Sequence, residues 1–237
     1  MLLFVANWKM NKTRAEARAY AADLGARIGE KIPGRELVLA PAFTALDAAR
    51  DPGERWSLAC QNVSAESSGA FTGEVSARMA AEAGCRYAII GHSERRRLFG
   101  EDGPMLSRKL QRCREAGLTP IYCLGETDDE REAGLTSATL VRQVETLEKD
   151  PKNSSLVVAY EPVWAIGTGK AATPEDAASA RVHLAELLSA RPNLRILYGG
   201  SVTPENAAAL LDESGMDGFL IGGASLSVAA FESIARA

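Results

Sequence analysis

The chain has 237 residues, a length typical of one large domain or two small ones, and one that buries a hydrophobic core without metal or disulfide bridges. It carries 27 basic and 31 acidic residues, and the net charge of -4 excludes a strongly basic nucleic-acid surface. We therefore expect no nucleic-acid partner, and an anionic ligand must be attracted by local groups.

The first residues, the lengths of the apolar stretches and the cysteines indicate where the protein resides. Residues 1–6 are apolar but too short for a secretory signal, and no stretch approaches the length that spans a membrane. The cysteines stand singly, without metal-ligand spacing, at Cys60, Cys85, Cys113 and Cys123. Isolated thiols are typical of a reduced intracellular protein. We expect a cytoplasmic protein with no membrane partner and no bound metal.

Short apolar segments recur along the whole chain, and most are continuous rather than alternating. They are residues 2–6, 37–40, 58–60, 87–90, 120–124, 156–160, 196–198 and 219–221. Continuous apolar runs indicate strands of a parallel sheet that is covered on both faces.

Segments rich in Ala, Leu, Arg and Glu with helical spacing lie between these runs. They include residues 13–28, 75–83, 103–116, 135–149, 175–190 and 205–211. Thr173 and Thr203, each followed by proline, predict helix starts, because a hydroxyl caps a helix whose first position suits proline. Gly84, Gly117 and Gly215 predict helix ends.

Eight strand–helix units in this length match the usual size of an α/β protein built as a single (β/α)8 barrel. An open doubly wound sheet is the structural alternative. That fold normally has a glycine-rich first turn, whereas the first strand here runs into Asn7-Trp8-Lys9. No linker divides the chain, so we expect one domain over residues 1–237.

One connection, residues 62–74, is unusually long and polar, yet it contains Phe71. Long loops in compact domains are uncommon and usually functional. The segment is either an exposed mobile loop or an arm that docks into a partner subunit.

Parallel barrels gather their reactive groups at the carboxyl ends of the strands. The polar residues at those positions are Asn7, Lys9, His92, Glu126 and Glu161. Glycine-rich turns follow the last two strands, at residues 199–201 and 222–225. Exposed backbone N–H groups in such turns suit a phosphate group.

Glu161 ends an apolar strand, and residues 162–170 follow with an apolar middle and glycines at the far end. This order predicts a catalytic base beneath a loop that can close over it. A strand-end glutamate in a surface ion pair is the alternative.

His92 follows the fourth predicted strand and precedes a helix start, whose dipole disfavours an imidazolium. We therefore expect a neutral ring that donates a hydrogen bond to a carbonyl oxygen. His183 falls within a helical segment and is assigned no chemistry.

Lys9 is either a solvated surface lysine or, beside an anionic site, a group that stabilises charge developing on a substrate. Glu94 and Arg95 are interpreted as an ion-pair network around these groups. Glu126 is assigned a structural role.

Five motifs together resemble the triose-phosphate isomerase family, in the right order from the first strand to the last. They are residues 7–11, 90–96, 160–170, 198–202 and 218–224. The resemblance implies a TIM barrel that interconverts dihydroxyacetone phosphate and D-glyceraldehyde 3-phosphate through an enediolate, in glycolysis and gluconeogenesis, without metal or cofactor.

The resemblance also implies a role for each site residue. Glu161 moves the proton between two carbons, His92 polarises the carbonyl group, and Lys9 and Asn7 stabilise the charge of the substrate. The residues implied to hold the phosphate are Gly167, Ser201, Gly222 and Gly223.

Residues 69–74 resemble the arm through which two subunits of this family join. The resemblance implies a homodimer that forms through the loop around Phe71 and Thr72. In that homodimer Thr72 approaches Asn7 and Lys9 of the partner subunit.

Two other functions fit the residues alone. The first is a phosphate-binding aldolase in which Lys9 forms a Schiff base. The second is a barrel without catalytic activity that binds a phosphate ligand or a protein partner, in which case Glu161 has no chemical role.

Overall fold

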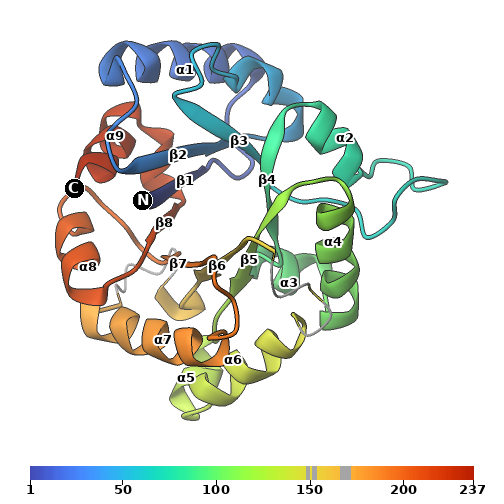
Figure 1. Ribbon diagram of the computed structural model, residues 1–237, viewed down its shortest axis with the longest axis vertical. Helices are drawn as coiled ribbons and strands as arrows, with labels where there is room; N and C mark the ends of the chain where they lie inside the picture. The colour runs from blue at the N-terminus through green and yellow to red at the C-terminus, as the bar shows by residue number, and fades with distance from the viewer. Residues whose placement is uncertain (148–149, 151–153, 166–171) are drawn as a thin grey trace.

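The protein is described by a computed structural model for residues 1–147, 150, 154–165 and 172–237. Its parallel strands pair in chain order, and the last strand pairs with the first to close a barrel. They are β1 (Leu2–Asn7), β2 (Arg35–Ala40), β3 (Trp56–Cys60), β4 (Cys85–Ile90), β5 (Thr119–Leu124), β6 (Leu156–Tyr160), β7 (Leu194–Tyr198) and β8 (Gly218–Ile221). Helices surround the strands (Figure 1), so the predicted (β/α)8 barrel is confirmed.

The helices follow the strands around the outside of the barrel. They are α1 (Arg14–Ile28), α2 (Ala77–Glu82), α3 (Ser93–Phe99), α4 (Gly103–Glu115), α5 (Asp128–Glu132), α6 (Thr136–Glu145), α7 (Pro174–Leu187), α8 (Ala207–Ser214) and α9 (Val228–Arg236). Helices were delimited from the sequence only for α1, α2, α4, α6, α7 and α8. No helix among the described ranges is long and apolar enough to cross a membrane.

One predicted helix start is confirmed and the other is wrong. The Thr173 side chain accepts a hydrogen bond from the Asp176 amide, and α7 begins at the following proline. Near Thr203 the helix α8 begins only at Ala207. The reason is local: the Asn206 side chain accepts a hydrogen bond from the Thr203 amide at 2.8 Å and closes a turn that delays the helix.

The second strand–helix unit also differs from the expectation. Residues 41–55, all of them described, form the short 3-10 turns η1 (Phe43–Ala45) and η2 (Asp47–Ala49) in place of an α-helix. The backbone of Arg50, which follows η2, is extended. The Trp56 indole at the start of β3 donates to the Ala49 carbonyl at 2.9 Å. This hydrogen bond folds the connection back onto the barrel.

Buried apolar side chains form two groups on the two sides of the strands. The smaller group fills the barrel interior and includes Leu3, Val5, Val38, Ala40, Ala59, Ile89, Ile121, Cys123, Val157, Ala159, Leu197 and Leu220. Members two residues apart share a strand, as expected when alternate side chains point inward. The larger group lies between the strands and the helices.

Three polar side chains close the barrel at the amino ends of its strands. The Tyr87 hydroxyl of β4 donates to Glu36 of β2 at 2.5 Å, and Arg195 of β7 contacts that carboxylate at 2.7 Å. The Arg195 guanidinium also donates to the Tyr87 oxygen at 3.0 Å. Burial raises the pKa of Glu36, but the bonds from Tyr87 and Arg195 outweigh it, and the pKa is lowered. We call these three residues the barrel floor.

The long connection between β3 and α2 projects beyond the helices (Figure 1) and contains neither helix nor strand over residues 62–74. At its base the Ser64 amide donates to the Val75 carbonyl at 2.8 Å, and within its second half the Glu74 amide donates to the Phe71 carbonyl at 3.0 Å. The Phe71 side chain is 47% exposed. The loop therefore presents an aromatic ring to its surroundings.

Candidate active site

The alternation that fills the barrel interior also builds the site. The next inward positions after Val5, Ala59 and Ala159 are Asn7, Gln61 and Glu161, at the carboxyl ends of their strands.

A cavity of about 310 Å³ opens at this end of the barrel. All the described residues that were expected to bind or act on the substrate line it: Asn7, Lys9, His92, Glu161, Ser201, Gly222 and Gly223. Gly167 lies outside the described residues, as does most of the predicted lid.

Glu161 is almost completely buried at the end of β6, and two glycines make room for it. A Cβ atom at Gly125 would lie 1.8 Å from the Glu161 carbonyl oxygen, and Gly125 has a φ of 155°. A Cβ atom at Gly199 would lie 3.0 Å from Cγ of Glu161. These close neighbours leave the backbone of Glu161 little freedom to move. The carboxylate of the candidate base is therefore attached to a fixed backbone position.

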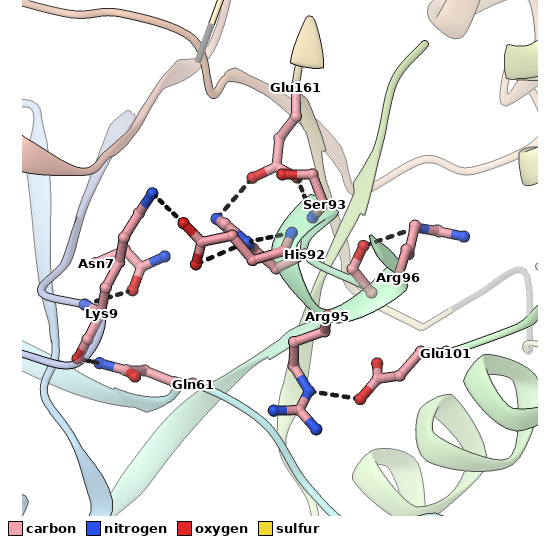
Figure 2. Close-up of polar contacts among 11 residues, drawn as sticks. Asn7, Lys9, Gln61, His92, Ser93, Arg95, Arg96, Glu101 and Glu161 are labelled. Atoms are coloured by element: carbon pink, nitrogen blue, oxygen red, sulfur yellow. Dashed lines mark hydrogen bonds and ion pairs between the residues drawn. The ribbon is translucent and has the colours of Figure 1, made fainter. Parts of the chain in front are cut away.

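The Glu161 carboxylate has two partners (Figure 2). One oxygen lies 3.0 Å from Nε2 of His92, and the other accepts a hydrogen bond from the Ser93 amide at 2.8 Å. Burial raises the pKa of Glu161, but the charge and hydrogen bonds of His92 and Ser93 outweigh it, and the pKa is lowered. Glu161 is therefore ionised, as a general base must be.

His92 caps the start of α3, where its Nδ1 accepts a hydrogen bond from the Glu94 amide at 3.2 Å. Because Nδ1 accepts, a neutral ring carries its proton on Nε2, which faces Glu161. Burial lowers the pKa of His92, but the carboxylates of Glu161 and Glu94 outweigh it, and the pKa is raised.

The raised pKa of His92 is opposite in direction to the lowered pKa that the helix dipole alone predicts. The sequence pattern did not reveal that two carboxylates face the ring of His92. The increase depends chiefly on Glu161 resting against the ring, so it weakens when that carboxylate moves away. The expectation of a neutral ring stays a prediction for the substrate complex.

Lys9 is fixed at both its side chain and its backbone. Its Nζ lies 2.6 Å from a carboxylate oxygen of Glu94, and its amide donates to the Asn7 side chain at 3.1 Å. The Gln61 side chain donates to the carbonyls of Lys9 and Ala40, each at 2.8 Å. Gln61 was not recognised from the sequence; the signal was a polar residue immediately after β3.

The expected ion-pair network is divided between two places. Glu94 contacts Lys9 and His92, whereas Arg95 contacts Glu101, which also binds the buried Lys109 (Figure 2 shows the Arg95 pair). Glu94 therefore contacts two residues that line the cavity, whereas Arg95 belongs to a separate structural network.

Glu126 has the structural role that was expected of it. Its fully buried carboxylate accepts hydrogen bonds from the Tyr160 hydroxyl at 3.0 Å and the Trp164 indole at 2.9 Å. The Arg131 guanidinium lies 4.0 Å from the centre of a Trp164 ring. Glu126 thus holds η3 (Val163–Ala165), which begins two residues after the candidate base.

The glycine-rich side of the cavity ends in the 3-10 turn η4 (Gly223–Leu226). A Cβ atom at Gly222 would lie 3.4 Å from Cε of Lys9, and one at Gly223 would meet open space. The first amides of such a turn have no carbonyl within the turn to bind, so they are available to an anion. Across the cavity the Ser201 hydroxyl donates to the Ala165 carbonyl at 2.8 Å.

The remaining candidates lie elsewhere. His183 on α7 lies 3.0 Å from the Ser137 hydroxyl on α6 and does not line the cavity described above. All four cysteines are buried and free. In the part of the chain that the structure describes, no group of three or more His, Cys, Asp or Glu residues is arranged to hold a metal ion.

The fold and the site define a (β/α)8-barrel enzyme that carries out acid–base chemistry on a small anionic substrate. A family model described as Triosephosphate isomerase matches residues 2–237. Curated relatives with that name include one from Chlorobium phaeobacteroides, 46% identical over 99% of this chain and 98% of the relative. One from Symbiobacterium thermophilum is 47% identical over 99% of this chain and 96% of the relative. One from Thermus thermophilus is 46% identical over 99% of this chain and 98% of the relative.

The chain belongs to the triosephosphate isomerase family. It catalyses the interconversion of dihydroxyacetone phosphate and D-glyceraldehyde 3-phosphate, a step of glycolysis.

Proposed function

We propose that residues 1–237 act as one catalytic domain in which Glu161 transfers the proton. Its carboxylate removes a proton from the carbon next to the carbonyl group, an enediolate forms, and the proton returns to the neighbouring carbon. The observation that carries this proposal is a buried, ionised carboxylate that lines the cavity and contacts an imidazole at 3.0 Å. A positioned base of this kind contributes on the order of 10²–10⁴-fold to the rate.

His92 supplies the second proton movement in this proposal. Its Nε2 polarises the substrate carbonyl and moves the oxygen-bound proton of the enediolate. Lys9 and Asn7 stabilise the negative charge on the substrate, and both line the same cavity. The Lys9 ammonium donates to a carboxylate, an environment that suits a cation rather than the neutral amine that a Schiff base requires.

The phosphate of the substrate binds at the glycine-rich side, to the backbone of Gly222 and Gly223 with Ser201 opposite. Gly167, which lies outside the described residues, is proposed to complete this grip when the lid closes. Held in this way, the phosphate supplies binding energy that orients the reacting carbons and keeps water out.

The experiment that tests these roles follows the carbon-bound hydrogen. The purified protein, without added metal, is incubated with dihydroxyacetone phosphate in deuterated buffer, and the exchange is read by NMR. We expect deuterium on the carbon next to the carbonyl group, and Glu161→Gln should remove it. Exchange that survives in Glu161→Gln, or a borohydride-trapped adduct on Lys9, would contradict the proton-transfer roles.

We also propose a cytoplasmic homodimer that forms through the loop around Phe71 and Thr72. Its support is the projection of this loop and the exposure of the Phe71 ring. Met10, beside the site, is 95% exposed and offers an apolar surface for a partner to cover. Membership of a family of glycolytic enzymes supports the cytoplasmic location.

A further inference from the structure

The turn η4 has one end in the cavity and the other end against the first strand–helix unit. Gly222, Gly223 and Ala224 line the cavity. At the far end, the Leu226 carbonyl accepts a hydrogen bond from Nζ of Lys12 at 3.0 Å. The adjacent Ser225 carbonyl accepts one from the Tyr20 hydroxyl at 2.9 Å. The side chains of Lys12 and Tyr20, near the N-terminus, therefore hold η4, which lies near the C-terminus.

Lys12 is itself held in place by aromatic rings. Its Nζ lies 5.5 Å from the ring centre of Trp8 and 4.8 Å from that of Tyr20, within the range of cation–π attraction. The two rings pack edge to face with centres 4.7 Å apart, and both are buried. The ammonium thus has a fixed position between two rings and a carbonyl oxygen.

The backbone of Lys12 indicates that this position is imposed by its surroundings. Its φ is 69°, in the left-handed region that residues with a side chain rarely adopt. Such a conformation costs free energy and persists only where neighbouring contacts compensate for it. Here the compensating contacts are those that the side chain makes with η4 and the rings.

We propose that Lys12 and Tyr20 are positioning residues that aim the amides of η4 at the substrate phosphate. Neither side chain lines the cavity, so both act through the turn. With Leu226 and Ser225 fixed, the amides at Gly222 and Gly223 keep their direction before the substrate arrives, and little reorganisation accompanies binding. The inference rests on the proposed phosphate grip at Gly222 and Gly223.

The test compares ligands that have a phosphate with one that does not. For Lys12→Met and Tyr20→Phe we measure the inhibition constant of inorganic phosphate, and kcat and KM for D-glyceraldehyde 3-phosphate and for D-glyceraldehyde. Loss of one hydrogen bond that orients the turn should weaken phosphate binding about 3- to 10-fold in each variant. The kcat/KM for D-glyceraldehyde should stay within about twofold, since that substrate has no phosphate to orient.

Two further variants separate positioning from charge and from general damage. Lys12→Arg keeps a cation that donates and stacks on rings, so it should restore most of the phosphate affinity. Lys31→Met removes the same charge from an exposed residue elsewhere and should behave as the wild type. Tyr20→Phe changes no charge, and its melting temperature shows whether the fold is intact.

Each outcome decides the inference. If Tyr20→Phe binds phosphate as the wild type does while Lys12→Met does not, the lysine acts through its charge alone, and the positioning role is wrong. If both variants lose activity equally toward both substrates, the contacts are merely structural. If the wild type itself does not bind inorganic phosphate in competition with substrate, the phosphate grip fails, and the inference fails with it.

Discussion

The carboxylate of Glu161 lies 3.0 Å from Nε2 of His92, so the two groups proposed to exchange protons with the substrate are paired with each other in the free protein. The substrate must separate this pair and also remove Glu161 from the Ser93 amide. Binding energy from the phosphate, remote from the reacting carbons, is available for that purpose.

The pairing predicts a change in the titration of His92. Replacing Glu161 with Gln removes the main contribution that raises the pKa of His92, and burial, which lowers it, remains. We expect the pKa of His92 to lie above the ordinary 6.5 in the wild type and to fall in Glu161→Gln. The measurement is an NMR titration of the ring protons.

The chain suits this titration because it contains only two histidines, His92 and His183. His183→Gln assigns the ring signals to the two residues, and Glu161→Gln is then compared with the wild type. An unchanged His92 titration in that variant would show that Glu161 does not rest against the ring in solution.

The same pair predicts how stability depends on pH. The lowered pKa of Glu161 contributes stability that is fully present above the ordinary 4.5 and is lost as the pH falls through the lowered value. The raised pKa of His92 contributes stability that is fully present below 6.5 and is lost as the pH rises through the raised value. The free energy of unfolding of the wild type should therefore exceed that of Glu161→Gln by the largest amount between pH 4.5 and 6.5. Urea denaturation of both proteins across this pH range measures the difference.

The reach of the Glu161 side chain should matter as well as its charge. Glu161→Asp keeps the carboxylate but withdraws it by about 1 Å, which should lower kcat on the order of 10²-fold. Inorganic phosphate should bind this variant nearly as tightly as the wild type. A steady-state assay with phosphate as a competitive inhibitor checks both statements, and an unaltered kcat would argue against Glu161 as the base.

The contact between Trp164 and Glu126 should stabilise the residues that follow the base. Trp164→Phe removes the indole donor from a fully buried carboxylate, and the free energy of unfolding should fall by about 1–3 kcal/mol. We expect kcat to fall as well, because η3 belongs to the part of the predicted lid nearest Glu161 in the sequence. Trp56→Phe, which loses a hydrogen bond to the Ala49 carbonyl far from the site, is the control for kcat.

The proposed homodimer depends on the exposed ring of Phe71. Phe71→Ser should shift the protein toward the monomer in sedimentation velocity at micromolar concentration. The control is Val182→Ser, which changes an apolar residue of α7 that is 55% exposed and should leave the assembly intact. A wild type that sediments as a monomer would contradict the proposal.

Much of the fold followed from local patterns. Continuous apolar runs indicated the strands, and strand ends identified Asn7, His92 and Glu161, because side-chain alternation and the geometry of a closed barrel bring such residues together. Errors arose where a nearby side chain competed with the expected element. The side chain of Asn206 closes a turn where Thr203 was expected to begin α8.

Contacts between distant parts of the chain could not be predicted from the sequence. The direction of the pKa shift of His92 depends on Glu161, which lies 69 residues away, and local helix geometry pointed the other way. Lys12 and Leu226 lie at opposite ends of the sequence, and no local pattern in either segment predicts the hydrogen bond between them. Such pairs become visible only when the barrel closes.

The barrel floor lies at the end of the barrel opposite the cavity. Glu36, Tyr87 and Arg195 bind one another at the amino ends of β2, β4 and β7, and apolar side chains fill the barrel interior. We therefore expect the substrate to enter and leave at the carboxyl ends of the strands only. Closure of that one end would then be enough to keep water away from a reactive intermediate.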